Sequence, residues 1–140
     1  MLLIHLLLFA TLISWRDLRT HLIPKRLTHL AIASLAPFLI DSAYTGIALA
    51  LTNYLLYRSL NFFSSNAIGL GDIRLSILIG GYVAGLGGEF SDLIWCNAMS
   101  WISCFFALLF HLLRRRGLMV QRVAFAPFMF FGVIYYAVRG

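Results

Sequence analysis

The sequence predicts an all-α, polytopic membrane bundle of about six transmembrane helices in a single domain, residues 1–140. Hydrophobic residues make up 61% of the chain and charged residues only 11%. A soluble domain of this length has too little interior to bury that much apolar surface. The apolar runs are also continuous, whereas a transmembrane β-barrel needs strands of alternating polarity about ten residues long. Lipid is therefore the expected solvent for most of the chain.

Six apolar segments follow one another along the chain, and some are shorter than the ~20 residues that cross a bilayer. We expect their helices to extend into the flanking loops or the bilayer to thin around them. The first segment lacks a basic amino-terminal region and a small-residue cleavage site, so it is expected to remain as a helix. Small residues permit close helix contact, so we expect the glycine-containing fourth segment to pack inside the bundle. The segments are 1–15, 27–40, 45–60, 75–86, 93–113 and 123–138.

The three prolines mark helix boundaries or bends in this scheme. Pro24 is expected to open the second helix, where its missing N–H costs little. Pro37 and Pro127 are expected to kink their spans.

Charge predicts the orientation of the six segments. Loops 16–26, 58–74 and 114–122 contain ten of the eleven basic residues, and the other two loops contain only acidic charges. Because Lys and Arg prefer the cytoplasmic side, the chain is predicted to be N-out and C-out. The run of three arginines from Arg114 is interpreted as a topogenic anchor, so no nucleic-acid partner is expected.

Two of the five acidic residues stand out by their position. Asp17 follows the first segment and Asp72 precedes the fourth, so two complete crossings separate them and both are predicted on the cytoplasmic face. Neighbouring carboxylates push their pKa values apart, which supplies the acid and the base that hydrolysis needs. A lone interfacial carboxylate, by contrast, usually neutralises an arginine or caps a helix, and Asp17 has such neighbours in Arg16 and Arg19.

The residues before Asp72 strengthen the acid–base interpretation. Gly69 and Gly71 bracket Leu70, and glycine lets the backbone and the carboxylate approach another segment closely. Gly-x-Gly-Asp alone is a weak motif. A helix start, a basic residue at Arg74 and a partner aspartate on the same face make the combination much rarer.

With these motifs the chain resembles the prepilin peptidases, bacterial membrane aspartic proteases that cleave leader peptides from type IV pilin-like precursors. The resemblance rests on Asp17-Leu-Arg-Thr-His-Leu-Ile-Pro-Lys25, on Gly69-Leu-Gly-Asp-Ile-Arg74, and on Ala124-Phe-Ala-Pro-Phe128, and it covers nearly the whole chain. It implies Asp17 and Asp72 as the catalytic pair, with Gly69, Gly71, Arg74 and Pro24 in supporting positions. Lys25 and Arg74 stand where the family usually has asparagine and lysine, and arginine lacks the compact shape of an ammonium group.

The resemblance also implies a partner and a location. The expected substrate is a prepilin-like protein cut at the cytoplasmic face of the bacterial inner membrane, in type IV pilus assembly or protein secretion. The amino-terminal methylating part of larger family members, with its CxxC motifs, is not seen, so the chain resembles the short peptidase-only forms. No cofactor is expected. Cys96 and Cys104 have no zinc-site or disulfide spacing, and His21 and His29 lack the pattern of a metal site.

Other functions remain open at this point. A presenilin-like protease also uses a Gly-x-Gly-Asp aspartate, but its first aspartate lies within a span. A proton-coupled transporter also uses paired carboxylates in a membrane, although an internal repeat would then be more typical. An inactive relative that only binds pilins is a third alternative. The oligomeric state is not indicated by the sequence.

Overall fold

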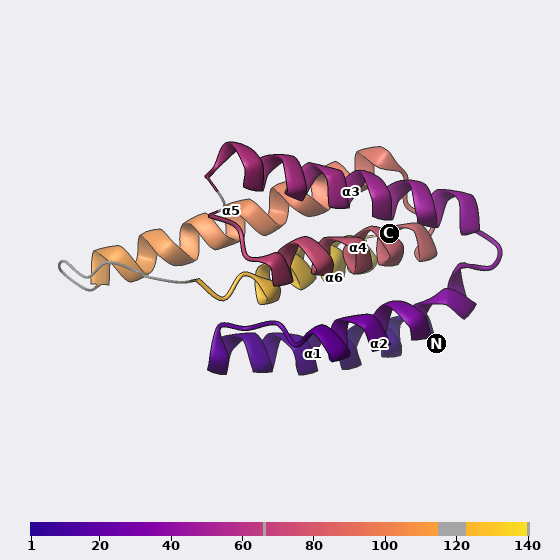
Figure 1. The fold of residues 1–140 in the computed structure, drawn as a ribbon, viewed down its shortest axis with the longest axis horizontal. Coiled ribbons are helices and arrows are strands. Elements are labelled where there is room, and N and C mark those ends of the chain that lie inside the picture. The colour runs from indigo at the N-terminus through magenta and orange to yellow at the C-terminus, as the bar shows by residue number, and fades with distance from the viewer. Residues whose placement is uncertain (66, 115–122, 140) are drawn as a thin grey trace.

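The computed structural model describes residues 1–65, 67–114 and 123–139, and these are helical with short connections. The helices run roughly along one axis and alternate in direction, and both termini lie toward the same end (Figure 1). The all-α prediction is confirmed, and each predicted apolar segment coincides with a helix. The elements are α1 (Leu2–Thr20), α2 (Lys25–Leu35), the 3-10 turn η1 (Ala36–Leu39), α3 (Ala43–Phe63), α4 (Leu70–Gly85), α5 (Phe90–Arg114) and α6 (Ala126–Arg139).

Two helices extend beyond their apolar runs, and this places both key aspartates inside helices rather than in loops. Asp17 lies in the last turn of α1, which ends where His21 adopts a left-handed conformation with φ 50°. The backbone N–H of His21 donates to the Asp17 carbonyl oxygen at 2.7 Å. Asp72 lies in the first turn of α4. Polar residues continue a helix readily, so the apolar run understates its length; after the apolar run of α1 no Gly or Pro occurs before Pro24.

The prolines behave differently from the prediction at one position. Pro24 precedes the first residue of α2 as its N-cap, close to the predicted place. Pro37 lies in η1, where the helix tightens before it ends. Pro127 is the second residue of α6 and therefore does not kink that helix, contrary to the prediction. The first turn of a helix lacks intrahelical partners for its N–H groups, so proline is tolerated there.

The centre of the bundle is α4, which packs against α2, α3 and α6. Most of its residues are buried, as predicted for the glycine-containing segment. A Cβ atom at Gly80 would lie 2.6 Å from the Leu49 carbonyl oxygen and 2.7 Å from the Ala50 Cα atom. Glycine at this position therefore sets the close approach of α3 and α4.

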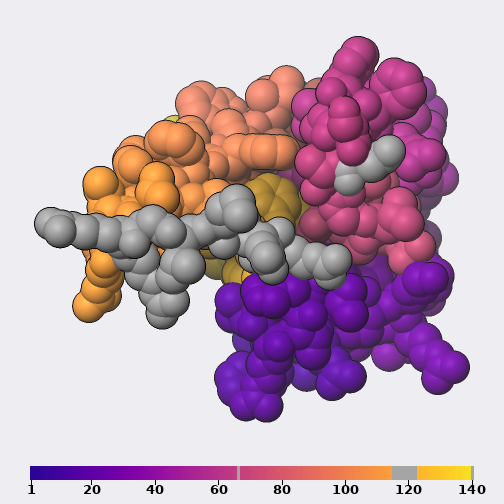
Figure 2. Space-filling model, turned by 60° about the vertical axis from the view of Figure 1, so that its left-hand side comes forward, coloured from indigo at the N-terminus to yellow at the C-terminus, as the bar shows by residue number. Residues whose placement is uncertain are grey.

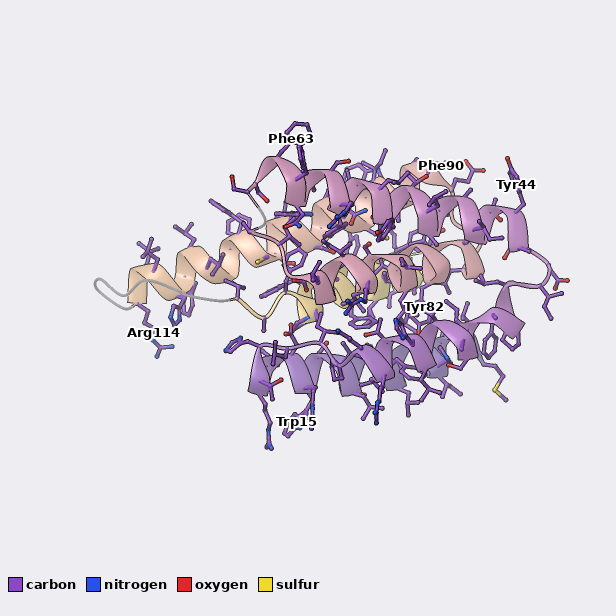
Figure 3. All side chains as sticks on the ribbon, viewed as in Figure 1. Trp15, Tyr44, Phe63, Tyr82, Phe90 and Arg114 are labelled. Atoms are coloured by element: carbon purple, nitrogen blue, oxygen red, sulfur yellow. The ribbon has the colours of Figure 1, made fainter. Side chains whose placement is uncertain are left out.

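At the end of the bundle far from Asp17, side chains join α1 and α2 to α4. The two ring nitrogens of His5 lie 2.8 Å from the Tyr82 hydroxyl and 2.8 Å from the Ser34 hydroxyl. Figure 3 shows Tyr82 between α4 and α1, whereas Trp15, Tyr44 and Phe63 point away from the bundle. The first and fourth segments are therefore in contact, which the pairing of the two aspartates requires.

Charge separates between the two ends of the described bundle. The ends of α1 and α5 and the starts of α2 and α4 carry basic residues, and the opposite end carries Asp41, Glu89 and Asp92 together with one basic residue, Arg139 of α6. Apart from Arg114, the predicted basic loop 114–122 lies outside the described residues. Among the described helices, α5 alone is both long and apolar enough to cross a membrane, and α6 is apolar but shorter. The expectation of six spans thus stays a prediction.

Candidate functional site

The start of α4 is built around Asp72. Gly69 is the N-cap residue in an extended conformation, and its carbonyl oxygen accepts from the N–H groups of Asp72 and Ile73 at 3.1 and 3.2 Å. The Asp72 carboxylate in turn accepts from the backbone N–H of Gly69. This is one half of a capping box, in which the third helical residue binds back to the N-cap N–H; Gly69 has no side chain to supply the other half. It fixes the Asp72 side chain at the mouth of the helix.

The segment that leads into α4 is held by α3. The side-chain oxygen of Asn61, in the last turn of α3, accepts from the Ile68 N–H at 2.9 Å. Asn61 is itself buried. The sequence analysis did not identify this residue, although a polar residue shortly before the Gly-x-Gly-Asp motif was a usable signal. Asn61 thus positions the backbone immediately before the glycines.

Asp17 joins α1 to α6. Its side chain is only 4% exposed, and its Oδ2 atom accepts from the Ala126 N–H at 3.0 Å. Ala126 is the first residue of α6, where the unpaired N–H groups carry partial positive charge. The first aspartate motif and the Ala-Phe-Ala-Pro-Phe segment, far apart in the sequence, therefore meet at one helix end.

The loop after Asp17 packs against the start of α4. A Cβ atom at Gly71 would lie 2.9 Å from the Ile23 Cβ atom. Ile23 is the residue before Pro24, which ends the loop and caps α2. Because Gly71 has no side chain, Ile23 of the loop after Asp17 can pack directly against the start of α4, next to Asp72. At Gly69, a Cβ would lie 3.1 Å from the Asp72 Oδ2 atom, so that glycine leaves room for the carboxylate.

Asp17 and Asp72 line the same cavity, which has a volume of about 720 Å³. Figure 2 brings this end forward and shows the residues of α1 and α2 below those of α3 and α4, with α5 to one side. The supporting residues Gly69, Gly71 and Arg74 also line the cavity, whereas Pro24 acts behind it through Ile23. The remaining lining residues are His21, Leu22, Ile23, Lys25, Tyr57, Ala67, Ile68, Leu70, Trp101, Cys104, Val123 and Phe125.

The two carboxyl groups differ in their electrostatic surroundings. Both lie outside the predicted spans 1–15 and 75–86. Burial and, second, the charge of Asp17 raise the pKa of Asp72, the Gly69 N–H opposes both effects, and the net result is a pKa of about 7. Burial also raises the pKa of Asp17, but the Ala126 N–H and His21 act in the opposite direction. Burial thus raises the pKa of both carboxyl groups, and the charge of each neighbour bears on the other as in a coupled acid–base pair.

The described residues contain no group of three or more His, Cys, Asp or Glu side chains placed to hold a metal ion. Three lining residues that the sequence analysis did not assign to the site come from α3 and α5, namely Tyr57, Trp101 and Cys104. Their positions depend on helix packing rather than on a local motif.

No family model matches the chain, and neither a curated protein nor a solved structure is significantly similar to it. The geometry of the cavity and the motif resemblance are therefore the observations on which a function is argued.

The Asp17 contact with α6 predicts a difference between two substitutions. Asp17→Asn keeps a side-chain oxygen for the Ala126 N–H, whereas Asp17→Ala leaves that N–H without it. We expect the alanine variant to be less stable than the asparagine variant by about 1 kcal/mol, the usual cost of losing a cap. Thermal unfolding in one detergent measures the difference. The exposed Asp41 supplies the control, since Asp41→Ala and Asp41→Asn should unfold at the same temperature. Equal stability of the two Asp17 variants would contradict the capping role.

Proposed function

We propose that the protein is a membrane-embedded aspartic endopeptidase that removes the leader peptide from type IV prepilin-like precursors. The observation that carries this proposal is that Asp17 and Asp72 line one cavity, where burial and the charge of Asp17 raise the pKa of Asp72 to about 7. The motif resemblance gives the substrate class, a protein with a basic leader ahead of a hydrophobic helix. The proposed location is the bacterial inner membrane, with the cavity at its cytoplasmic face.

The proposed six spans agree with the outer surface of the helices. Large apolar side chains are exposed along the outward faces of several helices, where water would oppose them and lipid would not. The alternation of basic and acidic ends agrees with an N-out, C-out orientation. The exposed apolar residues include Leu3, Ile4, Leu7, Leu8 and Leu12 of α1, Ile47, Leu51 and Leu55 of α3, and Ile94, Ile102, Phe105, Phe106 and Phe110 of α5.

In the proposed mechanism, ionised Asp17 takes a proton from a water molecule and the oxygen of that water attacks the scissile carbonyl carbon. Protonated Asp72 gives its proton to the carbonyl oxygen, which forms a neutral tetrahedral diol. The diol then returns a proton to Asp72, Asp17 protonates the amide nitrogen, and the C–N bond breaks. Both carboxyl groups end in their starting states, and neither a metal nor a cofactor takes part in these steps.

The remaining residues of the site act by position and charge. Gly71 permits the contact that joins the two motifs, and Gly69 both caps α4 and leaves room for the Asp72 carboxylate. Arg74 follows Asp72 by two residues along α4 and lines the cavity, where its charge assists electrostatically or binds lipid phosphate. Pro24 fixes the end of the loop that carries Ile23.

The paired mechanism predicts that each aspartate is indispensable. Asp17→Asn and Asp72→Asn should each abolish cleavage of a co-expressed prepilin, because an amide does not alternate between acid and base. The double variant should lose little more than either single variant, since losses within one catalytic unit are not additive. Mass measurement of the new pilin amino terminus gives the readout.

Asp41→Asn and Asp92→Asn, at the opposite end of the bundle, are the matched controls and should retain activity. Substantial cleavage by either single variant of the pair would rule out the mechanism. Processing of no prepilin by the unsubstituted protein would favour a transporter or an inactive pilin-binding protein instead.

The raised pKa of Asp72 predicts the alkaline limb of the pH profile. The proposed acid is active only while protonated, so kcat/KM for a leader-junction peptide should fall as the pH rises through about 7. Initial rates in detergent between pH 5 and pH 9 would measure this, and a rate still rising at the alkaline end would contradict it.

Infrared titration gives a check that does not depend on activity. In Asp17→Asn the carboxyl band should show a lower pKa for Asp72, because the charge of Asp17, which raises that pKa, is removed.

Orientation is tested by thiol labelling in a background without Cys96 and Cys104. Thr20→Cys, at the basic end, should be shielded from an impermeant reagent added outside intact cells. Ala43→Cys, at the acidic end, should react, since both side chains are exposed on the protein. Labelling of position 20 from outside would overturn the cytoplasmic location of the cavity.

A further inference from the structure

His21, the residue that ends α1, combines a constrained backbone with a place in the cavity. Its φ angle is 50°, in the left-handed region where glycine is the usual residue after a helix. Its backbone N–H closes the last turn on the Asp17 carbonyl oxygen at 2.7 Å. Its side chain is exposed and lines the cavity with Asp17 and Asp72. A non-glycine residue in this conformation beside a site points to a role for its side chain.

The arginines that neighbour Asp17 in the sequence do not share the cavity with it. The Arg19 Cζ atom lies 4.3 Å from the centroid of the Trp15 ring, and Trp15 points away from the bundle (Figure 3). Arg16 is exposed, and neither arginine is among the cavity-lining residues. His21 is therefore the basic side chain from this helix end that lines the same cavity as the Asp17 carboxylate.

The charge of His21 has the sign that favours an ionised Asp17. Burial raises the pKa of the Asp17 carboxyl group, and the Ala126 N–H and the charge of His21 both lower it. Lysine and arginine side chains keep their charge from acidic to neutral pH, whereas histidine gains its charge in this range. A histidine therefore gives the site a positive charge that depends on pH. The other charged or titratable lining residues are Lys25 of α2, Tyr57 of α3, Asp72 and Arg74 of α4, and Cys104 of α5.

We propose that His21 is a positioning residue for the base, and that its protonated ring is the charge partner that keeps Asp17 ionised in mildly acidic solution. Protonation of the ring as the pH falls adds a positive charge near the carboxylate, which opposes protonation of Asp17. Activity would thus extend to lower pH than Asp17 alone allows. The inference rests on the proposed function, in which Asp17 is the base, and it adds a residue to which the motif resemblance assigns no role.

The first test compares His21→Asn with His21→Arg by infrared titration of the Asp17 carboxyl band in an Asp72→Asn background. Asparagine accepts the left-handed conformation but carries no charge, whereas arginine keeps a positive charge at every pH of the test. The pKa of Asp17 should be higher in His21→Asn, because a charge that lowers it is removed, and it should not rise in His21→Arg. This readout needs no substrate.

The second test measures kcat/KM for a leader-junction peptide at pH 5 and at pH 8. The ratio of the pH 5 value to the pH 8 value should be about 2- to 5-fold lower in His21→Asn than in the unsubstituted protein, the range for an exposed charge pair. His29→Asn is the matched control and should keep the ratio, because His29 is also exposed but lies on α2 outside the cavity lining.

His21→Gly is a second uncharged variant in case His21→Asn does not fold, since glycine adopts the left-handed backbone without strain. It should shift the Asp17 titration in the same direction. If His21 only ends the helix, the Asp17 titration and the rate ratio will be unchanged in these variants, and that result would overturn the proposal, as would an equal change in His29→Asn. A shifted titration without cleavage of any prepilin by the unsubstituted protein would overturn the peptidase proposal and leave His21 as the charge partner of Asp17.

Discussion

Two carboxylates held by helix N-termini, Asp17 buried and Asp72 half-buried, are the constraint on which this structure depends. Burying a carboxylate is costly unless hydrogen bonds or positive charge replace its water. Asp72 receives a backbone N–H at the start of α4, and Asp17 receives one from the start of α6. Because the helices alternate in direction, the even-numbered helices all begin at one end of the bundle. The end that collects these N-termini is therefore the end where two carboxylates are best tolerated.

The two helix ends do not hold their carboxylates equally, and the chemistry follows from that difference. Asp72 caps its own helix, because its carboxylate accepts from the N–H of Gly69, three residues earlier in the same segment. Asp17 binds a different helix, and it has no Gly-x-Gly turn of its own. Burial raises the pKa of both groups; for Asp72 the charge of Asp17 adds to this and the pKa reaches about 7 despite the Gly69 N–H, while the rise for Asp17 is opposed by the Ala126 N–H and His21. Such separation within a pair is what acid–base catalysis at neutral pH requires.

The sequence was informative where a local pattern decides the outcome. Apolar runs predicted six helices, and glycine content predicted that α4 is interior, because both are properties of neighbouring residues. Helix ends were less predictable. Asp17 and Asp72 were placed in the loops, because a helix end made of polar residues has the same low hydropathy as a loop. Pro127 was expected to kink a span because the start of α6 was placed three residues too early, at 123 rather than Ala126. The contacts of Ala126 and Trp101 were not predictable, because each depends on how separate helices pack.

The same packing connects the aspartates to a buried hydrogen-bonded network, in which the Tyr57 hydroxyl donates to Asn97 and the Asn97 amide donates to Asn53. Asn53 binds the carbonyl oxygen of Ser76, one helical turn beyond Asp72, so the network that fixes Tyr57 also fixes the rotation of α4. Gly80, a turn further on, brings α3 close enough for that hydrogen bond to form. A satisfied polar network in an apolar surrounding resists slippage, because any shift leaves buried amide groups without partners. The position of Asp72 is thus set from both sides, by the capping glycine in front and by the asparagines behind.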